Sequence, residues 1–84
     1  MLYTAYVLID DKGRLYKGVS NCFARRFLEH VSGKTKTTKS MQGLRLAYKE
    51  EYESFAEARK RELYFKTGAG SRFLKKVLRV DMSL

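Results

Sequence analysis

The segment LYTAYVLIDDKGRLYKGV, residues 2–19, decides the fold because it joins two strand-forming stretches through a turn. Leu2 to Ile9 is apolar and rich in aromatic and β-branched residues, which favours a strand. The sequence Asp10-Asp11-Lys12-Gly13 is typical of a turn, since aspartate tolerates tight bends and glycine adopts positive φ. Arg14 to Val19 alternates in polarity and predicts a second strand. We therefore expect a β-hairpin.

The middle of the chain predicts a helix, a loop and a third strand. Asn21 is the expected N-cap of the helix, which should end near Ser32-Gly33 because glycine can adopt the left-handed conformation. The basic tract KTKTTKSMQG, residues 34–43, predicts a solvated loop, and Leu44 to Tyr52 predicts a strand. Apolar residues at helical spacing are Phe23, Ala24, Phe27, Leu28 and Val31, and those expected on one face of the strand are Leu44, Leu46, Tyr48 and Tyr52.

Two helices are expected in the last third of the chain. Ser54 to Glu57 has the form of a capping box, which predicts a helix that runs to about Thr67. We expect Gly68-Ala69-Gly70 to break that helix, and a basic amphipathic helix to follow from Ser71 to about Val80. The predicted order is ββαβαα. It indicates an α/β (α+β) fold with a small three-stranded, mainly antiparallel sheet flanked by helices.

The composition limits the classes of protein that the chain can represent. Its 84 residues provide room for one small domain over 1–84, and 18 Lys+Arg against 9 Asp+Glu give a formal charge of +9. This excess indicates a polyanionic partner, with nucleic acid as the first candidate. No apolar run approaches the roughly 20 residues of a membrane span, and the N-terminal segment lacks the features of a secretory signal. Cys22, the single cysteine and expected in the core, excludes an internal disulfide and fits a cytoplasmic location.

One carboxylate is placed unusually. On the second predicted helix, Phe55, Ala58, Phe65 and Ala69 fall within one apolar arc, and Glu62 lies inside it. A carboxylate there is costly unless it has a partner. A salt bridge to a neighbouring arginine is the interpretation that we favour from this position alone. The alternative is a ligand for a divalent cation, because hard cations prefer carboxylate oxygen.

Four other side chains are candidates for a phosphate-directed site. Arg26 and His30 stand four residues apart on the first predicted helix, so both project from one side of it and can meet one phosphate. Tyr16 shares the more polar face of the hairpin with Gly18, and Tyr6 of the first strand can lie in the same region. Each of these residues taken alone is more simply an ordinary strand tyrosine, a surface arginine or a partly buried histidine.

Taken in order, these residues form a pattern that resembles a known family. Thr4-Ala5-Tyr6, Tyr16-Lys17-Gly18, Arg26, His30 and Glu62 resemble the GIY-YIG nuclease domain of homing endonucleases and of the incision subunit of bacterial excision repair. Tyr16 follows Tyr6 by ten residues, and Arg26 and His30 follow Tyr16 by ten and fourteen. The segments FARRFLEHVSGK, EARKREL and KTGAGSRFLKK look most like the short stand-alone bacterial members.

The resemblance implies metal-dependent hydrolysis of a DNA phosphodiester, in repair or recombination. Glu62 would hold Mg²⁺ or Mn²⁺, and Arg26 would stabilise the charge on the phosphate. Tyr16 would help to activate water, although free tyrosine has a pKa of about 10 and needs nearby positive charge to do so. Tyr6 and His30 would orient the water and the phosphate. Residues expected to contact nucleic acid are Lys17, Arg25, Lys34, Lys36, Lys39, Arg72, Lys75 and Lys76.

A non-catalytic or weakly catalytic DNA- or RNA-binding module is the alternative function. Many members of the family carry an asparagine near the C-terminal end, and this chain has none after Glu62. The basic surface would serve binding equally well, with a steep salt dependence of affinity. In either case we expect a monomer or a weak dimer, and a protein partner could direct the domain to its target.

Overall fold

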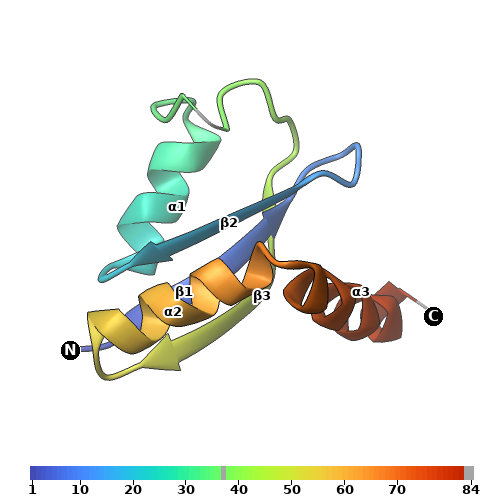
Figure 1. The fold of residues 1–84 in the computed structure, drawn as a ribbon. Helices are drawn as coiled ribbons and strands as arrows, with labels where there is room; N and C mark the ends of the chain where they lie inside the picture. Colours follow the sequence, from blue (N-terminus) through green and yellow to red (C-terminus); the bar gives the residue numbers. More distant parts are fainter. Residues whose placement is uncertain (37, 83–84) are drawn as a thin grey trace.

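The computed structural model describes residues 1–36 and 38–82, and within them the chain forms one three-stranded sheet and three helices (Figure 1). The strands pair in the order β2-β1-β3, and both pairings are antiparallel. This arrangement confirms the predicted α+β class and the order ββαβαα. The elements are β1 (Tyr3–Ile9), β2 (Leu15–Ser20), α1 (Phe23–Val31), β3 (Arg45–Tyr52), α2 (Phe55–Phe65) and α3 (Gly68–Met82).

The predicted hairpin is formed by β1 and β2, and Asp10 organises its turn. The Asp10 carboxylate accepts hydrogen bonds from the backbone N–H groups of Lys12 and Arg14 at 3.0 and 2.7 Å. Gly13 has a φ of +80°, which few other residues adopt readily. The second strand begins at Leu15, one residue later than expected. Arg14 belongs to the turn, where its Nε atom donates a hydrogen bond to the Asp10 carboxylate at 2.8 Å.

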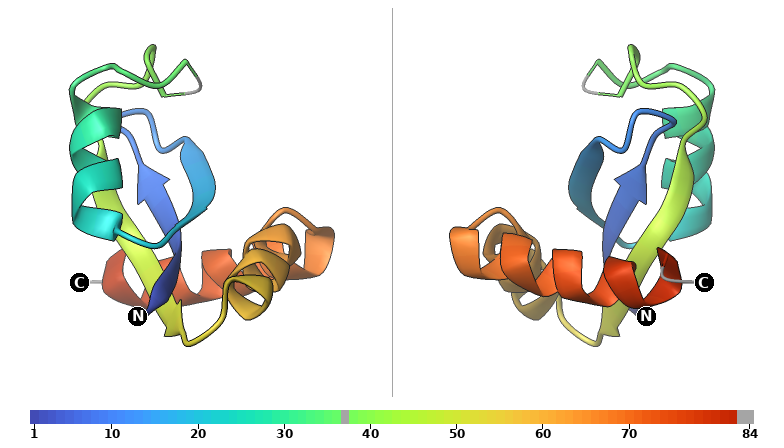
Figure 2. Two further views of the ribbon diagram at one scale, coloured as in Figure 1. Left: turned by 90° about the vertical axis from the view of Figure 1, so that its left-hand side faces the viewer. Right: turned by 90° about the vertical axis from the view of Figure 1, so that its right-hand side faces the viewer.

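The helices cover the two faces of the sheet. Figure 2 shows α1 on one face and α2 with α3 on the other. Ala5 and Val7 of β1 face α2 and α3, where they pack with Phe65 and Leu74 in the buried core. Residues of β1 that alternate with these face α1, so Tyr6 lies against that helix. The sheet therefore separates an apolar core from a second face that carries polar side chains.

The first helix begins and packs differently from the prediction. Its N-cap is Cys22 rather than Asn21, and no side chain caps it; instead, the Ser20 hydroxyl accepts a hydrogen bond from the Cys22 backbone N–H at 3.0 Å. Cys22 is exposed, so the expectation that it belongs to the core is wrong. Leu28 is 65% exposed, whereas His30 is buried. The side of α1 that faces the sheet thus runs through the histidine and not through Leu28.

The third strand contains an irregularity that the alternation of its sequence concealed. It begins at Arg45, one residue after the expected start. Tyr48 pairs with Val7, but Leu46 pairs with Leu8, so the register shifts by one residue between these pairs. A bulge of this kind turns the side chains that follow it to the other face. Leu46 is consequently exposed and does not share a face with Tyr48, contrary to the prediction.

The start of the last helix corrects a second expectation. Ser54 caps α2, as predicted, by accepting a hydrogen bond from the Glu57 backbone N–H at 3.2 Å, and α2 ends at Phe65. The Thr67 hydroxyl accepts a hydrogen bond from the Gly70 N–H at 3.0 Å and so caps α3. The segment 68–70 therefore forms the first turn of α3 instead of a break between helices.

Replacing Gly70 by alanine will destabilise the fold. A Cβ atom at Gly70 would overlap the backbone carbonyl oxygen of Tyr64, and backbone cannot move aside as a flexible side chain can. We expect the free energy of unfolding to fall by about 1–3 kcal/mol, measured by urea denaturation. Gly68→Ala is the matched control, since its Cβ would lie 3.6 Å from the nearest atom, Nη1 of Arg72. Equal stability of the two variants would contradict close packing of α2 against α3.

Candidate active site

Two tyrosines and the histidine meet on the face of the sheet that α1 covers. Tyr6 pairs with Gly18 across the hairpin, and Tyr16 pairs with Leu8, which places both phenols on that face. The Tyr16 ring lies 4.9 Å from the His30 ring between centroids, and the two tyrosine rings lie 6.3 Å apart. The hairpin and α1 thus bring together three of the predicted site residues, as the sequence spacing had suggested.

Gly18 provides the space that this cluster needs. A Cβ atom at Gly18 would lie 2.5 Å from the Tyr6 hydroxyl oxygen and 3.1 Å from the Tyr16 ring. The group that lies closest to Gly18 is the Tyr6 side chain. Gly18 therefore sets the position of the Tyr6 hydroxyl.

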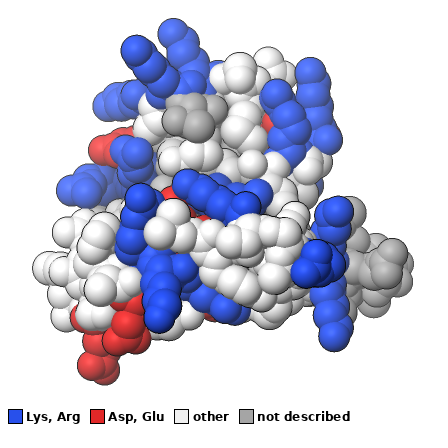
Figure 3. Space-filling model, in the orientation of Figure 1, with Lys and Arg blue, Asp and Glu red and all other residues white. Residues whose placement is uncertain are grey.

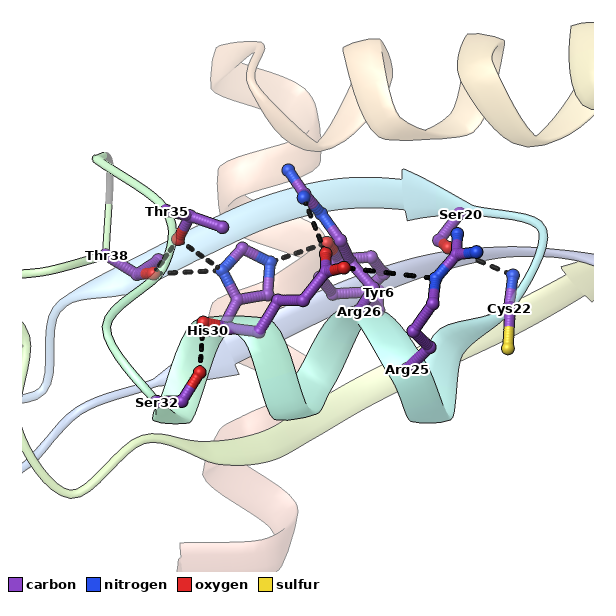
Figure 4. A network of polar contacts seen from close by, with 10 residues as sticks. Tyr6, Ser20, Cys22, Arg25, Arg26, His30, Ser32, Thr35 and Thr38 are labelled. Carbon is purple, nitrogen blue, oxygen red and sulfur yellow. Dashed lines mark hydrogen bonds and ion pairs between the residues drawn. The ribbon is translucent and has the colours of Figure 1, made fainter.

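His30 connects Tyr6 to the loop that follows α1. The Tyr6 hydroxyl hydrogen-bonds His30 Nε2 at 2.8 Å, and His30 Nδ1 hydrogen-bonds the hydroxyl groups of Thr38 at 2.9 Å and Thr35 at 3.0 Å (Figure 4). Thr38 is buried, so the loop is not entirely solvated as predicted. His30 itself is only 1% exposed, more deeply buried than expected for a surface histidine. The two threonines are site residues that the sequence analysis missed.

The surroundings of the cluster shift the protonation of its members. Burial, followed by the nearby Tyr16 phenol, raises the pKa of Tyr6 to about 12, although the adjacent guanidinium of Arg26 opposes this shift. Burial, followed by the charge of Arg26, lowers the pKa of His30 below its usual value. Tyr6 is therefore protonated and His30 neutral at pH 7. The pair forms a fixed hydrogen-bonded unit, which does not readily ionise.

Arg26 stands at the edge of the cluster. Its Nη1 atom donates a hydrogen bond to Glu29 Oε1 at 3.0 Å, and this bond, followed by the nearby phenols of Tyr6 and Tyr16, raises the pKa of Arg26. Arg25 reaches the other Glu29 oxygen only at 4.0 Å and is mostly exposed. Arg26 is partly buried, so its guanidinium lies between the polar cluster and solvent. A phosphate group is the kind of ligand that an arginine in this position can bind.

Glu62 lies on α2, on the other side of the sheet from α1. It is 4% exposed, and the neighbouring Ala58 and Phe65 on its face are buried, as the apolar arc predicted. Phe55 and Ala69, expected in the same arc, are exposed, and Ala69 belongs to α3. Burial and then the Tyr16 phenol raise the pKa of Tyr6, and the Glu62 carboxylate adds a smaller effect in the same direction.

Two basic side chains hold the Glu62 carboxylate. Arg59 Nη1 donates to Glu62 Oε1 at 2.5 Å, and Lys66 Nζ lies 2.9 Å from Oε2. These ion pairs agree with the interpretation favoured from the sequence, a salt bridge to a neighbouring arginine. Both cations are about half exposed and can move into water, but the carboxylate that they leave is buried and then requires another cation in their place. Glu62 is thus buried and paired, with its partners on the solvent side.

The basic residues expected to bind nucleic acid are spread over several elements. In Figure 3, Lys and Arg side chains lie over the loop after α1, over α2 and over α3. Lys17 pairs with Val7 and therefore faces away from Tyr16, on the other side of the sheet. The remaining predicted contacts are exposed, and they are Arg25, Lys34, Lys36, Lys39, Arg72, Lys75 and Lys76. Within the described part of the chain, no helix is long and apolar enough to cross a membrane.

The fold and the cluster define a small α+β domain in which a hairpin presents two tyrosines to a histidine and an arginine. The sequence model of the GIY-YIG catalytic domain matches residues 2–75, so the chain belongs to the GIY-YIG family, a nuclease family. The solution NMR structure of the UPF0213 protein BH0048 from Bacillus halodurans is similar, with a TM-score of 0.57 and 28% identity over 92% of this chain and 85% of that one. No curated protein matches significantly.

Proposed function

We propose that residues 1–84 form one nuclease domain that hydrolyses a phosphodiester bond of nucleic acid, most simply DNA, with a divalent cation. The observation that carries the proposal is the convergence of Tyr6, Tyr16, Arg26 and His30 on one face of the sheet in a chain of this family. A net charge of +9 supports a polyanionic substrate.

Tyr6 and Tyr16 have different roles in this proposal because their surroundings differ. Tyr6 is buried, hydrogen-bonded to His30 and protonated, so it is suited to positioning rather than to accepting a proton. Tyr16 is only partly buried and lies beside the same histidine, so in our proposal it is the group that helps to take the proton from water. Arg26 would bind the phosphoryl oxygens as negative charge builds on them.

Glu62 is the proposed metal ligand. Among the described residues no group of three His, Cys, Asp or Glu side chains is placed to hold an ion, so in our proposal the ion has one protein ligand, the buried Glu62 carboxylate. This donor set fits Mg²⁺, which keeps several waters and uses one or two carboxylates together with substrate phosphate. When bound, the ion supplies Lewis-acid stabilisation of the scissile phosphate. Arg59 and Lys66 would first have to release the carboxylate.

That same pairing supports a second candidate, a nucleic-acid-binding module without efficient catalysis. A Glu62 that remains bound to Arg59 and Lys66 is a structural ion pair and holds no metal. The nicking of supercoiled plasmid by purified protein with Mg²⁺, Mn²⁺ or EDTA distinguishes the two functions. Nicking in Mg²⁺ or Mn²⁺ that EDTA stops supports the nuclease. Salt-sensitive DNA binding without nicking in any of the three supports the binding module.

A further inference from the structure

A pocket of about 340 Å³ opens beside Arg26, where the start of β1 and the end of β2 meet the first turns of α1 and α2. None of its lining residues except Arg26 belongs to the cluster described above. The lining residues that matter here are Tyr3, Asn21, Arg25, Arg26, Glu29 and Phe55.

An exposed aromatic ring forms one wall of this pocket. Phe55 is 52% exposed, an unusual position for a phenylalanine in a chain that buries Phe65 completely. Tyr3 packs against Phe55 edge to face, with ring centroids 5.9 Å apart and planes at 73°. The Phe55 ring is thus held in place by an aromatic neighbour while part of its surface remains free. A flat ring of this kind is a stacking platform for a nucleobase.

Beside its two arginines, the pocket has polar groups that can contact a base. Glu29 lines the pocket, and the hydrogen bond from Arg26 lowers the pKa of its carboxyl, which is therefore ionised at pH 7. A carboxylate repels phosphate oxygens but accepts hydrogen bonds from the exocyclic amino groups of cytosine and similar bases. Asn21 adds an amide that can donate and accept. Arg26 connects the pocket to the cluster, where the adjacent phosphate would lie.

We propose that this pocket binds one unpaired nucleobase next to the phosphate that Arg26 contacts, stacked on Phe55. This inference rests on the proposed nuclease function and deepens it, because it names the substrate class: nucleic acid with an unpaired nucleotide beside the scissile bond. A base inside a continuous duplex is stacked on both sides and cannot enter the pocket. Single strands, flaps or bulges therefore bind better than paired DNA.

The test measures binding in EDTA, where metal-dependent cleavage is absent. The probes are a fluorescein-labelled single-stranded oligonucleotide of mixed sequence and a fully paired hairpin of the same length. Phe55→Ala is expected to weaken single-strand binding about ten-fold, as loss of one stacked base does, and to leave hairpin binding nearly unchanged. Leu63→Ala is the matched control, because Leu63 is 46% exposed on the same helix and lies outside the pocket.

Three further results decide the inference. Phe55→Trp should keep the single-strand affinity of the unaltered protein. Phe55→Leu, which has apolar bulk but no flat ring, should lose it. These two variants replace Phe55→Ala if the alanine variant does not fold. Equal losses on the two probes, or an equal loss in Leu63→Ala, overturn the inference. Phe55-dependent binding without cleavage of either the single-stranded probe or the plasmid in Mg²⁺ or Mn²⁺ overturns only the nuclease proposal. Cleavage with single-strand affinity unchanged in Phe55→Ala overturns only the nucleobase site.

Discussion

Glu62→Gln is expected to reduce metal-dependent plasmid nicking by about a thousand-fold, the upper end of the loss when one catalytic electrostatic group is removed. The amide has nearly the same shape as the carboxylate, so packing beside Ala58 and Phe65 is preserved. It lacks the charge that a hard cation requires. The nicking rate should therefore fall, while the affinity for the same plasmid, measured in EDTA, should remain almost unchanged.

Replacing the two basic partners of Glu62 by neutral residues distinguishes a metal ligand from a structural ion pair. If Glu62 served only to pair with Arg59 and Lys66, replacing both of these by glutamine would harm nicking as much as Glu62→Gln. We expect the double variant to keep most of its nicking at saturating Mg²⁺, because in our proposal the ion then neutralises the buried Glu62 carboxylate in place of the two cations. Glu57→Gln, an exposed glutamate in the first turn of the same helix, controls for general loss of charge. Nicking by Glu62→Gln at the rate of the unaltered protein would remove Glu62 from the proposed mechanism.

The sequence predicted the parts of the fold that depend on local patterns. The hairpin follows from residues 2–19, because the turn at Asp10–Gly13 and the strands beside it are encoded next to each other. The same hairpin explains why Tyr6 and Tyr16 could be expected together: a spacing of ten residues around a short turn returns the chain to the same face. Local capping at Ser54 was predicted for the same reason.

The errors arose where distant segments meet. The glycines at 68 and 70 have low helix propensity, but Gly70 is required by the close approach of α3 to the backbone of Tyr64, which no local pattern reveals. Thr38 is buried only because the loop folds back onto His30. Phe55 is spaced from Ala58 and Phe65 as a core residue of a helix would be. It is, however, the first residue of α2, and its side chain is half exposed beside Tyr3.

Arg26→Lys is expected to reduce nicking about a hundred-fold while DNA affinity in EDTA falls only slightly. Lysine keeps the positive charge but loses the planar fork that donates two parallel hydrogen bonds to phosphate oxygens. The fork matters most as charge develops on these oxygens during the reaction, so the turnover rate should fall far more than the affinity. The measurement is single-turnover nicking with protein in excess over plasmid.

A purely structural role for Arg26 predicts a different pattern. In that case its bond to Glu29 at 3.0 Å would be its function, and Glu29→Gln would lower the stability and the nicking rate as much as Arg26→Lys. Arg45→Lys is the control for replacing an arginine by lysine at a position outside the site. Arg45 is exposed on β3 and pairs with Asp11 only at 3.8 Å, so this variant should nick at the rate of the unaltered protein. A hundred-fold loss confined to Arg26→Lys, at unchanged stability, supports contact between the Arg26 guanidinium and the reacting phosphate. Glu29→Gln removes the ion pair and Arg45→Lys repeats the chemical change at another site, so neither factor would then explain the loss.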